Sequence, residues 1–240
     1  MTLSDAWEEH AQRWIEWARR PGHDSYARFH RDQFLALLPP PGRRTLDLGC
    51  GEGRVARDLA QLGHRVVGVD ASLTLVEAAR HAAPELEFVH ADAASLPFAD
   101  ETFDLVVAFM SLQDIDDMEG ALAESARVLE LGGTLCAAVV HPLNSAGKFE
   151  ADEAWSPFVI RDSYFERRRY VDDIERNGLT MTFVSDHRSI ADYVNPLLDV
   201  GLALERVGEV TVTPESITRP ASERWLRIPL FLHLRARRTG

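Results

Sequence analysis

The sequence has 240 residues, 45% of them hydrophobic, so the chain is long enough to bury one large core. Its formal net charge of -12 repels nucleic-acid phosphates, and we expect no nucleic-acid partner. Two cysteines, Cys50 and Cys136, are too few for a zinc site or a disulfide framework and suit a reducing compartment. No signal-peptide pattern and no membrane-length apolar segment are present. We therefore expect a cytoplasmic monomer or homodimer without membrane contact.

The first forty residues carry a helical pattern. Trp7 and Trp14 lie on one apolar stripe with helical spacing, and a second stripe begins at Tyr26. Three prolines and a glycine at 39–42 end the second stripe. We expect residues 1–42 to form an N-terminal helical lid.

From residue 43 the pattern changes to short aliphatic runs that alternate with helical ones, which is typical of a parallel sheet wound through βα units. Gly132-Gly133 is expected to end the last helix of this series. Residues 43–141 are expected to form a Rossmann-like α/β core with helices on both faces of the sheet. The expected strands are 45–48, 65–69, 87–89, 105–109 and 134–140, and the expected helices are 54–62, 73–83 and 119–129.

The βα rhythm stops after His141, and residues 142–188 are aromatic, charged and irregular. Within them, two strand-like runs flank Asn177-Gly178, a pair that is favoured in two-residue hairpin turns because both positions need a positive φ. We expect a substrate-facing insertion with a β-hairpin after the fifth strand. Residues 189–240 then complete a seven-stranded, mostly parallel sheet. They supply a helix at 189–200 and strands at 204–211 and 230–236.

A glycine-rich turn after the first expected strand is the strongest functional signal. The glycines of Gly49-Cys50-Gly51-Glu52-Gly53 let the backbone approach a ligand that a Cβ would push away. The second expected strand ends in Asp70, roughly 20 residues further on, where an acidic side chain meets a ribose diol in such folds. The pattern predicts a cofactor with a ribose at this edge of the sheet.

Two cofactor classes use such a turn. The spacing here is G-x-G-x-G and not the G-x-G-x-x-G of dinucleotide sites, and Arg54 stands where that fingerprint needs a small residue. Asp47 lies just before the glycines, where a carboxylate is unfavourable beside a pyrophosphate but favourable beside the α-ammonium group of a methionine moiety. The charge favours S-adenosylmethionine, and an NAD-dependent oxidoreductase stays the less favoured alternative.

Further motifs in the same order resemble the class I S-adenosylmethionine-dependent methyltransferases, in particular the methyltransferase type 11 branch that includes quinone-biosynthesis enzymes. The motifs are LDLGCGEG at 46–53, VDAS at 69–72, ADA at 91–93, LPF at 96–98, TFDLV at 102–106, RVL at 127–129 and GGTL at 132–135. The resemblance implies that Asp70 binds the ribose, Asp92 the adenine amino group and Ala93 a ring nitrogen. The expected cofactor-binding residues are Tyr26, Asp47, Gly49, Cys50, Gly51, Asp70, Ala71, Asp92, Ala93, Phe109 and Met110.

The chemistry of methyl transfer asks little more of the protein. A sulfonium makes its methyl group electrophilic, so the enzyme holds a nucleophile in line and removes its proton where there is one. His141 is the first candidate for this general base because it ends the fifth strand, on the edge where open α/β sheets bind ligands. His187 and Tyr26 follow.

We therefore expect an enzyme that transfers a methyl group from S-adenosylmethionine to an O, N or C nucleophile of a small organic molecule. A cofactor-binding protein without turnover is the alternative from another class, and a protein substrate stays open. Asp114, Asp116 and Asp117 are local candidates for metal ligands. Clustered aspartates after a strand are usually a solvated loop or a helix cap, so no metal is expected.

Overall fold

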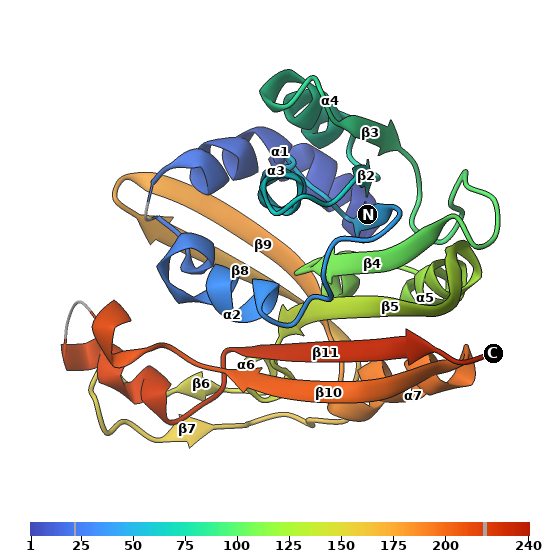
Figure 1. The fold of residues 1–240 in the computed structure, drawn as a ribbon. Helices are drawn as coiled ribbons and strands as arrows, with labels where there is room; N and C mark the ends of the chain where they lie inside the picture. Colours follow the sequence, from blue (N-terminus) through green and yellow to red (C-terminus); the bar gives the residue numbers. More distant parts are fainter. Residues whose placement is uncertain (22, 218–219) are drawn as a thin grey trace.

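The computed structural model describes residues 1–21, 23–217 and 220–240 and contains a twisted seven-stranded sheet (Figure 1). The strand order is β10-β11-β5-β4-β1-β2-β3. Strands β1 to β5 pair in parallel, whereas β11 runs antiparallel to both β5 and β10. The predicted Rossmann-like, mostly parallel sheet is confirmed. Its strands are β1 (Thr45–Leu48), β2 (Val66–Asp70), β3 (Glu87–His90), β4 (Phe103–Phe109), β5 (Leu129–Val140), β10 (Leu202–Val210) and β11 (Phe231–Arg238).

Two apolar cores, one on each face, hold helices against this sheet. Alternation along β4 supplies both, since Val106 belongs to one core and Leu105 to the other. The first core includes Leu122 of α5, and the second includes Leu59 of α3. The helices are α1 (Leu3–Arg19), α2 (Arg31–Leu35), α3 (Arg54–Gln61), α4 (Leu73–Ala82), α5 (Met118–Val128), α6 (Pro142–Ala146) and α7 (Ile190–Asp199). Short turns of other helix types are η1 (Tyr26–His30, a π-helix), η2 (Leu112–Asp114), η3 (Pro214–Ser216) and η4 (Pro220–Leu226).

The expected hairpin is present and lies beside the N-terminal helix. Strands β8 (Arg168–Arg176) and β9 (Leu179–His187) pair antiparallel, and Asn177 and Gly178 between them have φ angles of 51° and 76°. Both values are positive, as a two-residue hairpin turn requires. Figure 1 shows β9 running along α1, so the lid and the insertion share one surface. The remaining strands of the insertion are β6 (Lys148–Phe149) and β7 (Phe158–Val159).

One local expectation is wrong. Gly132-Gly133 does not end α5, because the chain passes from α5 directly into β5 at Leu129 and the glycines lie inside that strand. Gly132 has a φ of 81°, and the β4–β5 register shifts between Phe103 and Leu105, so the glycines accommodate a bulge. The second helical stripe is helical as expected, with the π-helical η1 followed directly by the short α2.

Polar contacts fasten the lid to the core at both ends of α1. The backbone N–H of Leu3 donates to both carboxylate oxygens of Asp116, at 3.0 and 2.9 Å. At the other end, Glu52 is 1% exposed and accepts hydrogen bonds from Arg19 of α1 and Arg57 of α3, each at 2.9 Å. Within the described residues, no helix has the length and apolarity needed to cross a membrane.

Replacing Glu52 with Gln is expected to loosen this attachment. The glutamine side chain is neutral and has only one acceptor oxygen, so the hydrogen bonds from Arg19 and Arg57 are weakened or lost, and the free energy of unfolding should fall by about 1–3 kcal/mol in urea titrations. Glu130→Gln is the matched control, since Glu130 forms an exposed ion pair with Arg43 and should cost under about 1 kcal/mol. Equal losses in the two variants would contradict the anchoring role of Glu52.

Candidate active site

The carboxyl ends of the parallel strands open into a cavity of about 660 Å³ beneath α1 and the β8–β9 hairpin. This is the edge at which open α/β sheets bind ligands. Two of the predicted site residues, Asp47 and His141, are not among those that line the cavity. Those that do line it are Tyr26, Gly49, Cys50, Gly51, Asp70, Ala71, Asp92, Ala93, Phe109 and Met110.

Gly49 and Gly51 play different structural roles in the glycine turn. Both have left-handed φ angles, 71° and 56°, which disfavour a side chain. A Cβ at Gly49 would stand 2.4 Å from the Cβ of Ser111, whereas a Cβ at Gly51 would meet only the Trp14 Nε1 at 3.4 Å. Gly49 therefore permits close packing of the turn, and Gly51 leaves its backbone open to a ligand.

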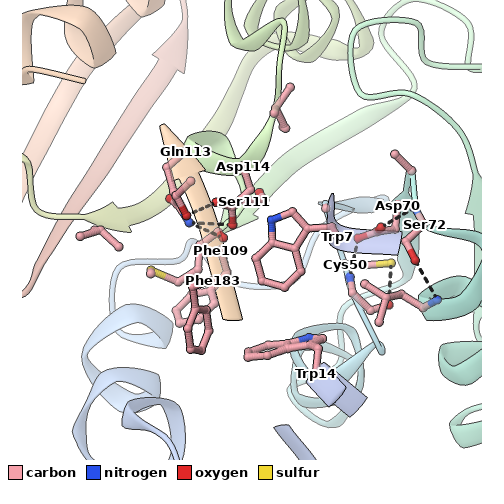
Figure 2. A pocket seen from close by; sticks show the side chains of 18 of the residues that line it. Trp7, Trp14, Cys50, Asp70, Ser72, Phe109, Ser111, Gln113, Asp114 and Phe183 are labelled. Atoms are coloured by element: carbon pink, nitrogen blue, oxygen red, sulfur yellow. Dashed lines mark hydrogen bonds between the residues drawn. The ribbon is translucent and has the colours of Figure 1, made fainter. Parts of the chain in front are cut away.

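Asp70 joins this turn to the end of β2. One oxygen of its carboxylate accepts the backbone N–H of Gly51 at 2.8 Å, and the other accepts the N–H of Ser72 at 2.9 Å (Figure 2). Burial raises the pKa of the Asp70 carboxyl, while these two hydrogen bonds act in the opposite direction. Each oxygen retains a further lone pair, which fits the two hydroxyl donors of a ribose diol.

Asp47 lies behind the turn, 1% exposed, and its Oδ2 has no hydrogen-bond partner. Burial, together with the nearby charge of Asp70, raises the pKa of the Asp47 carboxyl to about 7. A buried oxygen without a partner is costly, and positive charge in the cavity would stabilise its ionised form. This environment suits a cationic ligand and opposes a pyrophosphate.

The loops after β3 and β4 supply further residues to the cavity. Asp92 is exposed at the cavity after β3, and its Oδ1 accepts the N–H of Ala94 at 2.9 Å, which fixes the loop. Met110 directly follows β4 and has a φ of 58°, an unusual value for a residue other than glycine. Burial raises the pKa of the Cys50 thiol well above its usual range, so this cysteine is no nucleophile.

Aromatic side chains form the roof of the cavity. Phe183 of β9 contacts Trp7, Trp14 and Trp17 of α1 edge to face, with ring centroids 6.4, 6.0 and 5.9 Å away. Figure 2 shows Trp7, Trp14 and Phe183 around the space between Asp70 and Asp114. Such contacts are favourable for aromatic pairs and hold the hairpin against the lid.

The predicted general bases are all engaged elsewhere. His141 is 3% exposed; its Nε2 donates to Glu209 at 3.0 Å, and its Nδ1 accepts the N–H of Leu143 at 3.0 Å. His187 likewise contacts Ser145 with Nδ1 and the Tyr164 carbonyl with Nε2. Neither imidazole retains a free lone pair to accept a proton.

Tyr26 lines the cavity, but its hydroxyl donates to Asp58. Burial, followed by the hydrogen bond to Asp58, raises the pKa of the Tyr26 hydroxyl far above its usual value. A phenol in this environment stays protonated, so it cannot accept a proton from a substrate.

The sequence suggests Asp114 only as a candidate metal ligand, yet it lines the cavity. Its Oδ1 accepts the hydroxyl of Ser185 at 2.6 Å, and its Oδ2 accepts the side-chain amide of Gln113 at 3.1 Å. The neighbouring Asp117 caps α5. Among the described residues, no three histidine, cysteine, aspartate or glutamate side chains are grouped so as to hold a metal ion. The sequence signal for Asp114 is its position just after β4, at the cavity edge.

The strand order, the glycine turn and the acidic residue at the end of β2 together define the class I methyltransferase fold. The family described as methyltransferase domain matches residues 46–137. The chain is 38% identical over 98 residues to a demethylmenaquinone methyltransferase of Renibacterium salmoninarum, covering 41% of each chain. It is 33% identical over 177 residues to phthiotriol/phenolphthiotriol dimycocerosates methyltransferase 1 of Mycobacterium ulcerans, covering 72% of this chain and 64% of the relative. The aligned parts thus span less than two thirds of either relative.

A solved S-adenosylmethionine-dependent methyltransferase from Mesorhizobium loti is similar over a larger part of the chain. The two share 28% identity and superpose with a TM-score of 0.71, covering 86% of this chain and 96% of the other. Residues 46–137 thus match the methyltransferase-domain family, and the chain is similar in fold to solved methyltransferases that depend on S-adenosylmethionine as their cofactor.

Replacing Phe183 with Ala is expected to weaken the packing of α1 against the β8–β9 hairpin. The loss of three aromatic contacts should lower the free energy of unfolding by about 2 kcal/mol and speed amide hydrogen exchange in α1. Exchange followed by mass spectrometry measures the second effect. Phe165→Ala is the control, since Phe165 lies in the same insertion but is 81% exposed. Unchanged exchange in α1 would contradict the aromatic roof.

Proposed function

We propose that this protein transfers a methyl group from S-adenosylmethionine to a small organic acceptor. The observation that carries the proposal is that the glycine turn, Asp70 and the aromatic side chains of α1 and β9 all line one cavity. A methyltransferase needs its cofactor and acceptor in one water-poor space, because proximity and exclusion of water supply much of the rate. The cavity has room for the cofactor beside the glycine turn and for the acceptor beneath the aromatic side chains.

The charges at the cavity also fit this cofactor. Among the described residues that line the cavity, Arg54 is the one arginine. It is paired with Asp24 and lies over the rings of Trp14 and Tyr26. The remaining lining charges are carboxylates, which favour a ligand with a sulfonium and an ammonium group and disfavour one with a pyrophosphate. The lining carboxylates are Asp24, Glu52, Asp70, Asp92, Asp114, Asp116, Asp117 and Asp172.

In the proposed arrangement, the backbone at Gly49 and Gly51 meets the methionine part and Asp70 binds the ribose. Asp92 and Ala93 lie where an adenine would extend. Asp47 acts through its charge from behind the turn, since it does not line the cavity. When bound, S-adenosylmethionine supplies the electrophilic methyl group, and the chain's own residues orient the two reactants.

The acceptor would lie on the far side of the cavity, between the lid and the insertion. The relatives' names refer to menaquinone precursors and to phthiotriol lipids, both small molecules compared with a protein. Residues 1–42 and 142–188 would thus select the acceptor around a cofactor-binding core at 43–141 and 189–240. A cytoplasmic location and the absence of a nucleic-acid partner remain part of the proposal.

Replacing Asp70 with Ala tests the cofactor site. The loss of charge-assisted hydrogen bonds should weaken binding of S-adenosylhomocysteine by about tenfold to a hundredfold in calorimetric titrations. Asp100→Asn is the control, because Asp100 is an exposed partner of Arg127. An unchanged dissociation constant would exclude Asp70 as the ribose ligand. NADH is titrated in parallel, and binding of NADH alone would overturn the methyltransferase proposal.

A further inference from the structure

On the acceptor side of the cavity, two buried polar groups lack a hydrogen-bond partner, and a neighbouring carboxylate has lone pairs to spare. The indole Nε1 of Trp7 and the amide Oε1 of Gln113 are buried without any hydrogen-bond partner. Asp114 lies beside Gln113 and accepts only the two hydrogen bonds described above, which leaves it lone pairs. In Figure 2 the nitrogen of the Trp7 indole is on the side of the Asp114–Gln113 pair, away from Asp70.

Resting on the methyltransferase function proposed above, we propose that Asp114, Gln113 and Trp7 form the acceptor subsite, which takes an acidic hydroxyl group of a phenol or an enol and passes its proton to Asp114. A hydroxyl group is both donor and acceptor. It can therefore donate to Asp114 while it accepts from the Trp7 N–H. One oxygen atom of the ligand thus serves both a hydrogen-bond acceptor and a hydrogen-bond donor of the protein. The free Oε1 of Gln113 remains for a second donor on the ligand.

The unpartnered indole N–H favours oxygen over nitrogen at this position. An amine nitrogen has a single lone pair, which is consumed when it attacks the methyl carbon. A deprotonated oxygen has three, so it can attack, or feed the attack of an enol carbon, and still accept from Trp7. Donors aimed at an oxygen that gains negative charge also stabilise the transition state.

The transfer balances without any other reactant. A lone pair of the oxygen, or the π-electron pair of the enol, forms the new bond to the methyl carbon. The carbon–sulfur bond breaks with its electron pair left on sulfur, so the sulfonium becomes a neutral thioether. The hydroxyl proton moves to the Asp114 carboxylate, which becomes a neutral carboxylic acid and releases the proton to water once the product has left.

The surroundings of Asp114 give it the basicity that this task needs. Burial raises the pKa of its carboxyl to about 8, against the hydrogen bonds from Ser185 and Gln113. Of the charged groups that face it, Arg188 lowers this pKa and Asp186 raises it. Tyr170 of β8 and Tyr193 of α7 also interact with it, but their own raised pKa values keep them neutral. A base with a pKa near the working pH is the most effective.

The first test needs no acceptor. Carboxyl carbon NMR of the ¹³C-aspartate-labelled protein bound to S-adenosylhomocysteine should contain one resonance that titrates near pH 8 and is absent from Asp114→Asn. Titration of that resonance in the ordinary aspartate range, near pH 4, would overturn the assignment of Asp114 as the base.

The second test compares three naphthalenes that differ in one group. Calorimetry on the S-adenosylhomocysteine complex should find that 1-naphthol binds at least tenfold more tightly than 1-aminonaphthalene or 1-methoxynaphthalene. Trp7→Phe keeps the aromatic ring but removes the N–H, and should erase most of this preference. Equal binding of the three compounds to the unmodified protein would overturn the hydroxyl assignment.

The third test measures turnover by mass spectrometry with S-adenosylmethionine that carries a deuterated methyl group and a set of phenols, enols and amines. Asp114→Asn should lower turnover about a hundredfold or more without changing the affinity for S-adenosylhomocysteine. Asp162→Asn, an exposed change in the insertion, should alter neither. Full turnover in Asp114→Asn, or labelled amines as the products, would overturn the inference. Failure of the unmodified protein to bind S-adenosylhomocysteine would instead contradict the proposed function. The carboxyl titration, repeated without ligand, would still decide the role of Asp114.

Discussion

The carboxylate of Asp70 links the two loops on which the rest of the site depends. It accepts backbone N–H groups from Gly51 in the glycine turn and from Ser72 at the start of α4. These loops follow neighbouring parallel strands, so the link fixes the ends of β1 and β2 against each other. A carboxylate that accepts two backbone amides is held in one orientation, and its remaining lone pairs point where a ligand can use them. The same side chain thus supports the fold and the binding surface.

The lid and the insertion complete a site that the sheet alone leaves open. Neither can stand by itself, because α1 is a single amphipathic helix and an isolated hairpin is at best marginally stable. They stabilise each other through Phe183 and the tryptophans of α1, and Glu52 and Asp116 fasten α1 to the core. Acceptor contacts and lid stability therefore share residues, so a change in acceptor specificity at Trp7 or Phe183 also changes how firmly the cavity is closed.

The features that could be predicted from the sequence are those set by residues close together in the chain. Runs of alternating elements give the strands and helices of the core, and Asn177-Gly178 gives the hairpin turn, because these features depend on neighbours within a few positions. Gly132-Gly133 is predicted to end a helix but lies at a strand bulge. Both features use a glycine with a positive φ, and only the pairing with a partner strand distinguishes them. The hydrogen bond that engages His141 could not be predicted either, since its partner Glu209 stands 68 positions away on β10. Asp114 is found only when the hairpin brings Ser185 to it from 71 positions away.

The acidic cavity couples cofactor binding to stability. Asp47 and Asp114 both have carboxyl pKa values raised by burial, to about 7 and about 8, so folding keeps protons on groups that the unfolded chain releases near pH 4. Their contribution to stability is full below that pH and declines as the pH rises through these values. A ligand that brings positive charge beside Asp47 lowers its pKa and offsets part of this decline. Cofactor binding should then release protons at neutral pH, and the stabilisation that it gives should grow from pH 6 to pH 8.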